Sequence, residues 1–244
     1  MKTGSITLLV LCILALNAVA NYLPIGTIQG SGHTSSYVGS NVTTDGIVTR
    51  VYRDGFIIQS KTPDASQDTS DAIYVYQKDN QVQTGNELRV TGKIEEYVPG
   101  GNDSHNLSLT QIRADEIKLL SRRSDPPRPV VLNYLLPDFP KIIKQPGSPF
   151  NSKLNALDFF ESLEHMRVVI LDSVIVGPKT KYGEIAVAVP QAKPLPASSS
   201  GGVVKTDYAS APPKLLINLD RENAYTYNTG DRLKNPIHGT LTYS

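Results

Sequence analysis

The sequence predicts a mainly all-β fold of two tandem OB-like Greek-key barrels, with one short helix and a proline-rich connector. The first observation behind this prediction is a phrase that occurs twice, at Thr84–Tyr97 and Thr229–Tyr243. Each copy is a Thr-Gly-Asn/Asp turn, then a strand, a glycine and a second alternating segment that ends at tyrosine. A phrase that recurs about 145 residues later indicates two copies of one small domain. The second observation is a series of short apolar runs between turn-forming residues, without a long helical pattern.

The first 20 residues predict a cleaved secretion signal. Lys2 supplies the positive start, Ile6–Leu16 is a nearly pure apolar run, and Ala18-Val19-Ala20 gives the small-residue cleavage pattern. This run is too short to span a bilayer as a helix, and no later stretch is apolar for long enough. We therefore expect a secreted, extracellular protein that begins near Asn21 and has no membrane contact after cleavage.

Cysteine and charge exclude several classes of function. Cys12 is the only cysteine and lies in the signal, so disulfides, thiolate zinc sites and cysteine nucleophiles are excluded from the mature chain. The chain has 24 Lys and Arg and 23 Asp and Glu residues, and without Lys2 the mature chain has no net charge. A protein that grips phosphate backbones is usually more basic. Any nucleic-acid contact would therefore depend on a local patch or on stacking.

The first barrel is predicted over residues 21–120, after a glycine- and serine-rich lead-in at 21–40. The turn Arg53-Asp54-Gly55 lies between two apolar runs, which is a strong hairpin signal. After a polar loop at 60–71, we expect strands at Ala72–Tyr76, at Glu87–Tyr97 and from Leu107 to Leu120. Gly92, inside one of these strands, indicates a bulge or a tight bend. Five strands with a corner glycine suit an OB-type barrel, and an SH3-like barrel is the alternative.

Residues 121–150 predict a connector, because seven prolines between Pro126 and Pro149 interrupt any regular element. Its apolar side chains predict docking onto a domain rather than a loose tether; they are Leu132, Leu135, Leu136, Phe139, Ile142 and Ile143.

The second barrel is predicted over residues 151–244. A short helix is expected at Asn155–Glu164, and the strands after it are expected at Met166–Val176, Glu184–Val189 and Leu215–Leu219, followed by the second copy of the repeated phrase. The chain ends where the first copy continues into a further strand. We therefore expect a second barrel that is truncated or completed by a swapped element.

The residues resemble a known family. In the first half the matching segments are Ile28-Gln29-Gly30, Gly46–Thr49, Gly55–Gln59, Thr69–Tyr76 and Val90–Tyr97; in the second half they are Leu157–Glu164, Met166–Val168, Val176–Pro178 and Tyr182–Ile185. As a series over residues 25–244, they resemble the N-terminal OB-like region of secreted modular nucleases of the endonuclease/exonuclease/phosphatase superfamily. His165 departs from this pattern, which has a glycine there. The resemblance implies an accessory module without the catalytic domain.

No catalytic site is predicted. Metal-dependent phosphodiester cleavage needs clustered carboxylates and a histidine base, and none of the four histidines lies in such a pattern. The chain also contains no Gly-x-Ser-x-Gly nucleophile turn and no phosphate-binding loop. We therefore expect no enzyme activity, no metal and no cofactor.

The predicted ligand site is a barrel face, because OB folds bind oligonucleotides or sugars across their second and third strands. On this face of the first barrel we expect Arg50, Tyr52, Arg53, Gln59, Tyr74 and Tyr76; a weaker set in the second barrel is Arg167, Lys179, Lys181 and Tyr182. Tyrosine and arginine side by side provide base stacking and phosphate contact. The alternative is that the tyrosines belong to the core and the arginines only aid solubility.

Three Asn-x-Ser/Thr sequons predict glycosylation at Asn41, Asn102 and Asn106. The expected partners are single-stranded nucleic acid or a nuclease domain. The alternatives are an extracellular matrix protein that binds a matrix polymer and no nucleic acid, and a fragment of a secreted nuclease that lacks its catalytic domain.

Overall fold

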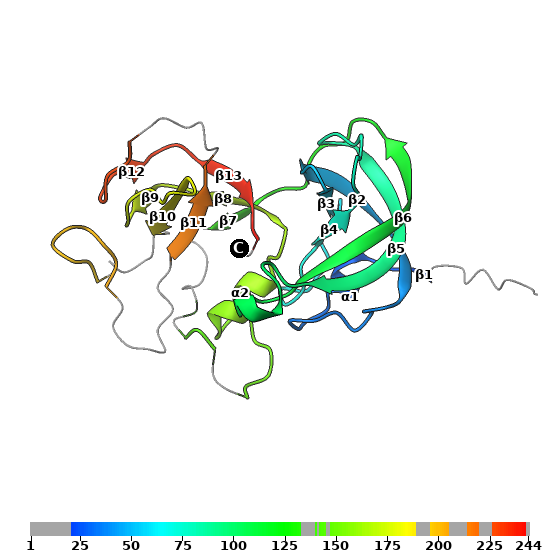
Figure 1. The fold of residues 1–244 in the computed structure, drawn as a ribbon, viewed down its shortest axis with the longest axis horizontal. Helices are drawn as coiled ribbons and strands as arrows, with labels where there is room; N and C mark the ends of the chain where they lie inside the picture. Colours follow the sequence, from blue (N-terminus) through cyan, green and yellow to red (C-terminus); the bar gives the residue numbers. More distant parts are fainter. Residues whose placement is uncertain are drawn as a thin grey trace, which may run out of the picture.

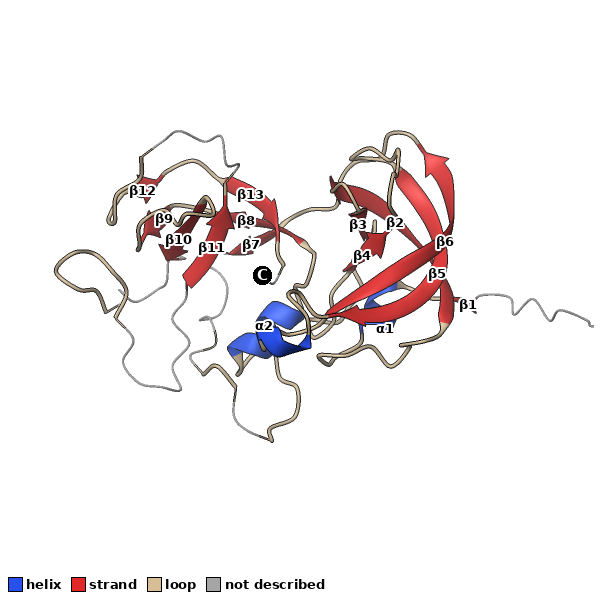
Figure 2. Cartoon of the chain, in the orientation of Figure 1, coloured by secondary structure: helices blue, strands red, loops and turns tan. Residues whose placement is uncertain are grey.

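The computed structural model describes residues 21–132, 140, 142–144, 147–188, 196–204, 214–219 and 226–242. The predicted signal at 1–20 and three apolar connector residues, Leu135, Leu136 and Phe139, lie outside these ranges. Strands dominate the described part, which has short helices only at α1 (Ile25–Gln29), η1 (Asn102–Ser104) and α2 (Ala156–Glu161) (Figure 2). The mainly all-β prediction is therefore confirmed. No helix in these ranges is long and apolar enough to cross a membrane.

Five strands of the first half close into a ring. The strands of this half are β1 (Asn21–Tyr22), β2 (Asn41–Val51), β3 (Gly55–Gln59), β4 (Ala72–Tyr76), β5 (Glu87–Tyr97) and β6 (Leu109–Ser121). Pairing runs β2–β3–β4–β6–β5, and β5 pairs with β2 again (Figure 1). Only β4 and β6 are parallel within the ring, and β1 adds to β2 as a short parallel edge. We call residues 21–121 the first unit.

Alternation along the strands fills this ring with apolar side chains. On β5, every second residue from Leu88 to Ile94 is buried and the residues between them are more exposed, as the two-residue repeat of a strand requires. The lead-in predicted at 21–40 contributes more than a loop. Its helix α1 places Ile25 and Ile28, both fully buried, in the same core.

The second half repeats the strand order of the first. Its strands are β7 (Val130–Leu132), β8 (Arg167–Ile170), β9 (Ser173–Ile175), β10 (Glu184–Ala188), β11 (Lys214–Asn218), β12 (Arg232–Leu233) and β13 (Ile237–Thr240). The order β11-β10-β9-β12 matches β4-β3-β2-β5, and β7 pairs in parallel with β8 as β1 does with β2. A second sheet has the order β13-β8-β7. Within the described ranges this second unit, from Val130 onward, has no counterpart of the ring-closing β6.

The repeated phrase forms the same turn twice. Gly85 donates its backbone N–H to the carbonyl of Val48 at 2.9 Å, and Gly230 donates to Ile175 at 2.8 Å. In each copy the side-chain oxygen of the next residue accepts a backbone N–H of the turn, at 3.0 and 2.8 Å. Both glycines have left-handed backbones, with φ 88° and 97°, which a side chain would disfavour. The sequence repeat is therefore a structural repeat.

The predicted connector contains a strand of the second unit. β7 lies within residues 121–150 and pairs with β8, and Leu132 is fully buried in the second core. The second unit therefore starts before residue 151, contrary to the predicted boundary. Three apolar residues directly after a proline are too short a run to distinguish from a connector, and an edge strand tolerates that proline.

The two units share a continuous contact. The apolar cluster of the second unit includes Ile57 from β3 and Ala72 from β4, both fully buried. The backbone N–H of Arg167 donates to the side-chain oxygen of Gln59 at 3.0 Å. The second unit therefore packs against strands β3 and β4 of the ring, with α2 between the units (Figure 1).

The sequon asparagines differ in exposure. Asn41, at the start of β2, and Asn102, in η1, are exposed. Asn106 is half-buried, and its side-chain amide donates to the carbonyl oxygen of Pro99 at 2.9 Å. Asn41 and Asn102 are therefore the more accessible of the three predicted glycan acceptors.

Gly92→Ala should lower the free energy of unfolding by about 1–3 kcal/mol, as overpacking does. The pairing of β5 with β6 shifts between Thr91 and Gly92, which confirms the predicted bulge. A Cβ on Gly92 would lie 2.3 Å from the carbonyl oxygen of Arg113 and 2.9 Å from the Cα of Ala114, so backbone would have to move. Urea denaturation of the variant measures the loss.

Gly239→Ala is the matched control, because Gly239 occupies the same place in the second copy of the phrase. A Cβ there meets nothing within 4 Å. Its free energy of unfolding should change by no more than about 0.5 kcal/mol. Equal losses in the two variants would contradict this account of the bulge.

Candidate ligand-binding cavity

A cavity of about 470 Å³ lies where the face of the first unit meets the second unit. The first unit contributes four tyrosines and three other residues, and the second unit contributes His165 and Thr242; the first-unit residues are Tyr52, Asp54, Tyr74, Tyr76, Tyr97, Leu109 and Gln111. We call this space the tyrosine cavity. Its volume falls within the range of about 300–1,000 Å³ that is typical of small-ligand sites.

Strand alternation directs two of the tyrosines into the cavity. On β4, Ile73 and Val75 are buried in the core of the ring, so Tyr74 and Tyr76 project from its other face. The hydroxyl of Tyr74 donates to Asp54 at 3.0 Å. Burial raises the pKa of Tyr74, and the hydrogen bond to Asp54 adds to this shift. Tyr74 therefore remains an uncharged phenol.

The end of β2 and the β2–β3 turn bring the third tyrosine and Arg50 to the same face. Tyr52 donates its backbone N–H to the carbonyl of Gly55 at 2.8 Å, which closes the turn. The ring of Tyr52 lies 5.9 Å from that of Tyr74, and the Arg50 guanidinium lies 5.2 Å from the centre of the Tyr52 ring. Arg50 and Arg53 are both exposed. The cavity therefore has aromatic walls and positive charge beside it.

Gln59, one of the predicted ligand residues, lies outside the cavity. It is 1% exposed, and its side-chain oxygen is occupied by the backbone N–H of Arg167. The prediction treated the face of β3 as open, but the second unit covers that part of it. The structure therefore removes Gln59 from the candidate site.

The residues predicted in the second unit do not reach the tyrosine cavity. Arg167 lies on β8, and its guanidinium donates to the carbonyl of Pro127. Lys179, Lys181 and Tyr182 lie between β9 and β10, where Lys181 lies 5.0 Å from the centre of the exposed Tyr182 ring. Of the predicted ligand residues, the structure brings together Tyr52, Tyr74 and Tyr76, with Arg50 over the Tyr52 ring, whereas Arg53 is exposed on the adjoining turn.

Several lining residues were not predicted from the sequence. Tyr97 ends the first copy of the repeated phrase, and Leu109 and Gln111 share one side of β6 by alternation, so a strand-by-strand analysis could have found them. His165 and Thr242 come from the second unit. Only the docking of the two units brings these two residues to the cavity.

His165 lies in the cavity wall under unusual conditions. It is 2% exposed, and its ring lies 5.9 Å from that of Tyr74. Its φ of 60° is left-handed, which explains why a glycine is expected at this position by resemblance. Burial lowers the pKa of His165 to about 3, so the imidazole is neutral at physiological pH. The ring can therefore both donate and accept a hydrogen bond.

A buried polar network fixes the backbone beside His165. The side chain of Glu164 accepts hydrogen bonds from the Gln29 amide at 3.3 Å and from the backbone N–H of Thr110 at 3.2 Å. The hydroxyl of Ser70 donates to the carbonyl of Glu164 at 2.5 Å. Burial raises the pKa of Glu164 well above its ordinary value, and the charge of nearby Glu161 adds to the shift. Three segments of the first unit thus hold the chain that presents His165.

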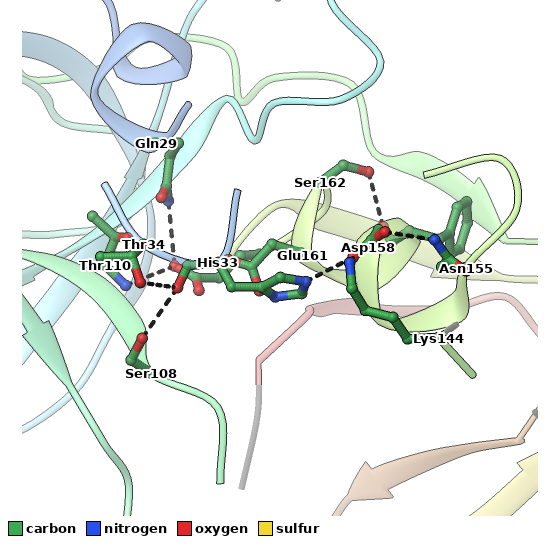
Figure 3. Close-up of polar contacts among 12 residues, drawn as sticks. Gln29, His33, Thr34, Ser108, Thr110, Lys144, Asn155, Asp158, Glu161 and Ser162 are labelled. Carbon is green, nitrogen blue, oxygen red and sulfur yellow. Dashed lines mark hydrogen bonds and ion pairs between the residues drawn. The ribbon is translucent and has the colours of Figure 1, made fainter. Parts of the chain in front are cut away.

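A second polar cluster joins the lead-in of the first unit to α2 (Figure 3). His33 lies between two carboxylates, with Nε2 at 2.7 Å from Asp158 and Nδ1 at 3.0 Å from Glu161. Both nitrogens can donate only when the ring is protonated. The hydrogen bond to Glu161 is the main cause that raises the pKa of His33. The cluster therefore joins the two units by ion pairs between His33 and the two carboxylates.

The side chains that line the cavity offer aromatic surfaces and a few polar groups. No group of three or more His, Cys, Asp or Glu residues in the described ranges could hold a metal ion. The aromatic rings offer stacking surfaces, and Asp54, Gln111, His165 and Thr242 offer polar groups. Such a combination of apolar walls and few polar groups is typical of a ligand site.

The comparison with known proteins finds one family. A family model described as a domain of unknown function (DUF8508) matches residues 119–244, just over half of the chain. This span includes β7 to β13 and α2, and therefore the residues that the second unit contributes to the cavity. No curated protein matches the chain.

Proposed function

We propose that this chain, which belongs to the DUF8508 family, is a secreted, non-catalytic binding protein that takes bases of single-stranded nucleic acid in its tyrosine cavity. The observation behind this proposal is the collection of four tyrosines in one cavity, with the exposed Arg50 guanidinium over the ring of one of them. The closed ring of five strands supports the OB-like assignment. In such folds this face is the usual place for an extended polymer.

Stacking supplies most of the binding energy in this proposal. Alanine substitution of a stacking aromatic residue costs about 1–3 kcal/mol per base, and every base has a face that can stack. The rings of Tyr52 and Tyr74 lie 5.9 Å apart and are tilted, so one base can contact both. Arg50, over the Tyr52 ring, can also contact a phosphate.

Charge has a smaller part, because the mature chain has no net charge. If Arg50 and Arg53 each neutralise one phosphate, the logarithm of the binding constant should fall with the logarithm of salt concentration with a slope of about −1.4. This slope distinguishes the proposed mode from that of a strongly basic groove, whose slope is much steeper.

A polysaccharide is the second candidate ligand. Asp54 lines the cavity, and a carboxylate repels phosphate but accepts hydrogen bonds from sugar hydroxyls. Gln111 and Thr242 offer further polar contacts there. OB folds bind oligosaccharides as well as oligonucleotides. Competition of a labelled oligonucleotide with a chito-oligosaccharide separates the two candidates.

Tyr52→Ala and Tyr76→Ala should each weaken binding of a labelled single-stranded 20-mer by between about 5-fold and about 150-fold, the loss of one stacking contact. Fluorescence anisotropy at low and moderate salt gives the affinities. Tyr182→Ala is the control, because this exposed tyrosine lies outside the cavity, and its affinity should match that of the wild type. No binding by the wild type at low salt, where charge attraction is strongest, would overturn the proposal.

A further inference from the structure

The imidazole of His165 is a buried polar group without a partner. Neither ring nitrogen has a hydrogen bond, and Nε2 lies 3.5 Å from the Glu164 carboxyl oxygen. Buried polar groups in folded proteins are almost always satisfied, so each exception calls for an explanation. The ring also lines the tyrosine cavity. Both nitrogens are covered from solvent, so a ligand in that cavity can satisfy one of them when the ring turns toward it.

The backbone of His165 has an unfavourable conformation that hydrogen bonds to a neighbouring segment hold in place. The left-handed φ of 60° is unfavourable for a residue with a side chain. It is fixed because the N–H of His165 donates to the carbonyl of Leu241 at 2.8 Å, and the next residue, Met166, accepts from the N–H of Leu241 at 3.0 Å. Strain of this kind persists where the surroundings over-determine it, and it concentrates at ligand sites.

We propose that His165 reads the polar edge of the base that stacks in the tyrosine cavity through one ring nitrogen, which turns toward the cavity when the base enters. This assignment rests on the proposed function, because it names the specificity residue of the same site. Tyrosine rings stack on any base and cannot by themselves distinguish one base from another. A hydrogen-bonding group can do so, because a wrong partner leaves it unpaired.

The test compares His165→Phe with the wild type on labelled 20-mers of dT, dA and dC. Phenylalanine keeps a flat ring and removes both unpaired nitrogens. Binding to the preferred homopolymer should weaken at least about tenfold, which corresponds to the loss of one hydrogen bond. The preference among the three homopolymers should disappear. The thermal midpoint should stay the same or rise by about 2–4 °C, because the unpaired polar atoms are gone.

His165→Asn is the second variant, because asparagine tolerates the left-handed backbone and keeps a donor and an acceptor. It should retain part of the preference among homopolymers. A merely structural role would change the thermal midpoint and leave that preference intact. Unchanged affinity and preference in His165→Phe, with binding by the wild type, would overturn this assignment alone. If the wild type binds none of the three oligonucleotides, the proposed function falls as well.

Discussion

Asp158→Ala is expected to lower the free energy of unfolding by about 2–4 kcal/mol. The carboxylate is fully buried and joins the lead-in of the first unit to the second. One oxygen lies 2.7 Å from His33 and 2.5 Å from Lys144, and the other accepts from Asn155 at 2.9 Å and from the N–H of Asn151 at 2.9 Å. Although burial acts to raise the pKa of Asp158, the hydrogen bond from Lys144 and the others lower it to about 2.

The expected size follows from what the substitution leaves behind. Breaking a buried ion pair costs about 3–5 kcal/mol when the remaining charge has no solvent. Here the side chains of Lys144 and His33 are each 26% exposed, so water reaches both after the change. His33 also keeps its contact with Glu161. The loss should therefore fall somewhat below the fully buried case.

Urea denaturation measures this loss, with Glu95→Ala as the matched control. Glu95 lies 3.0 Å from Arg113, whose side chain is 53% exposed, in an ion pair on the surface of the first unit. Exposed pairs contribute about 0–1 kcal/mol, so the control should lose little. Similar losses in the two variants would show that the buried cluster around Asp158 contributes no more to stability than a surface ion pair.

The strands of the first unit were largely predictable because alternation and turn chemistry are local signals. The predicted strand at Ala72–Tyr76 has the bounds of β4, and Gly92 marked the bulge of β5. The repeated phrase predicted a second unit, and its order β11-β10-β9-β12 bears the repeat out. In each case a short segment contained the physical signal, either a two-residue period or a glycine that needs space.

Short elements and contacts between segments were not predictable in the same way. Helix α1 has five residues, too few to show a helical period, yet it buries Ile25 and Ile28. The exclusion of Gln59 from the site follows from the docking of Arg167 against it. No pattern within one strand shows which of its faces another unit will cover. The two cavity residues that depend on docking, His165 and Thr242, were therefore missed.

Glu164→Gln should change the pH dependence of stability more than any other single substitution of a carboxylate in the described part of the chain. Burial is the main cause that raises the pKa of Glu164 well above the ordinary value of 4.5, so the folded chain keeps a proton that the unfolded chain releases. The stability associated with this proton is fully present below about pH 4.5. It is lost as the pH rises through the raised pKa of the folded state. Glutamine does not titrate, so the stability of the Glu164→Gln variant does not fall over this pH range.

The difference in unfolding free energy between Glu164→Gln and the wild type should therefore grow with pH, by at most about 1.4 kcal/mol per pH unit. The variant should be the more stable protein at neutral pH. Glutamine keeps the oxygen that accepts from Gln29 and Thr110, and its amide nitrogen replaces an oxygen, Oε2, that has no partner. The change therefore removes the titration without removing a hydrogen bond.

Urea denaturation at several pH values between 4.5 and 8 gives this difference directly. Glu116→Gln is the control, because Glu116 is exposed on β6, and its stability curve should run parallel to that of the wild type. Because Glu164 precedes His165, the same measurement tests whether the segment that presents the cavity histidine is held by uncharged groups. Parallel curves for Glu164→Gln and the wild type would mean that Glu164 is ionised in the folded protein, and His165 would then have an anion beside it.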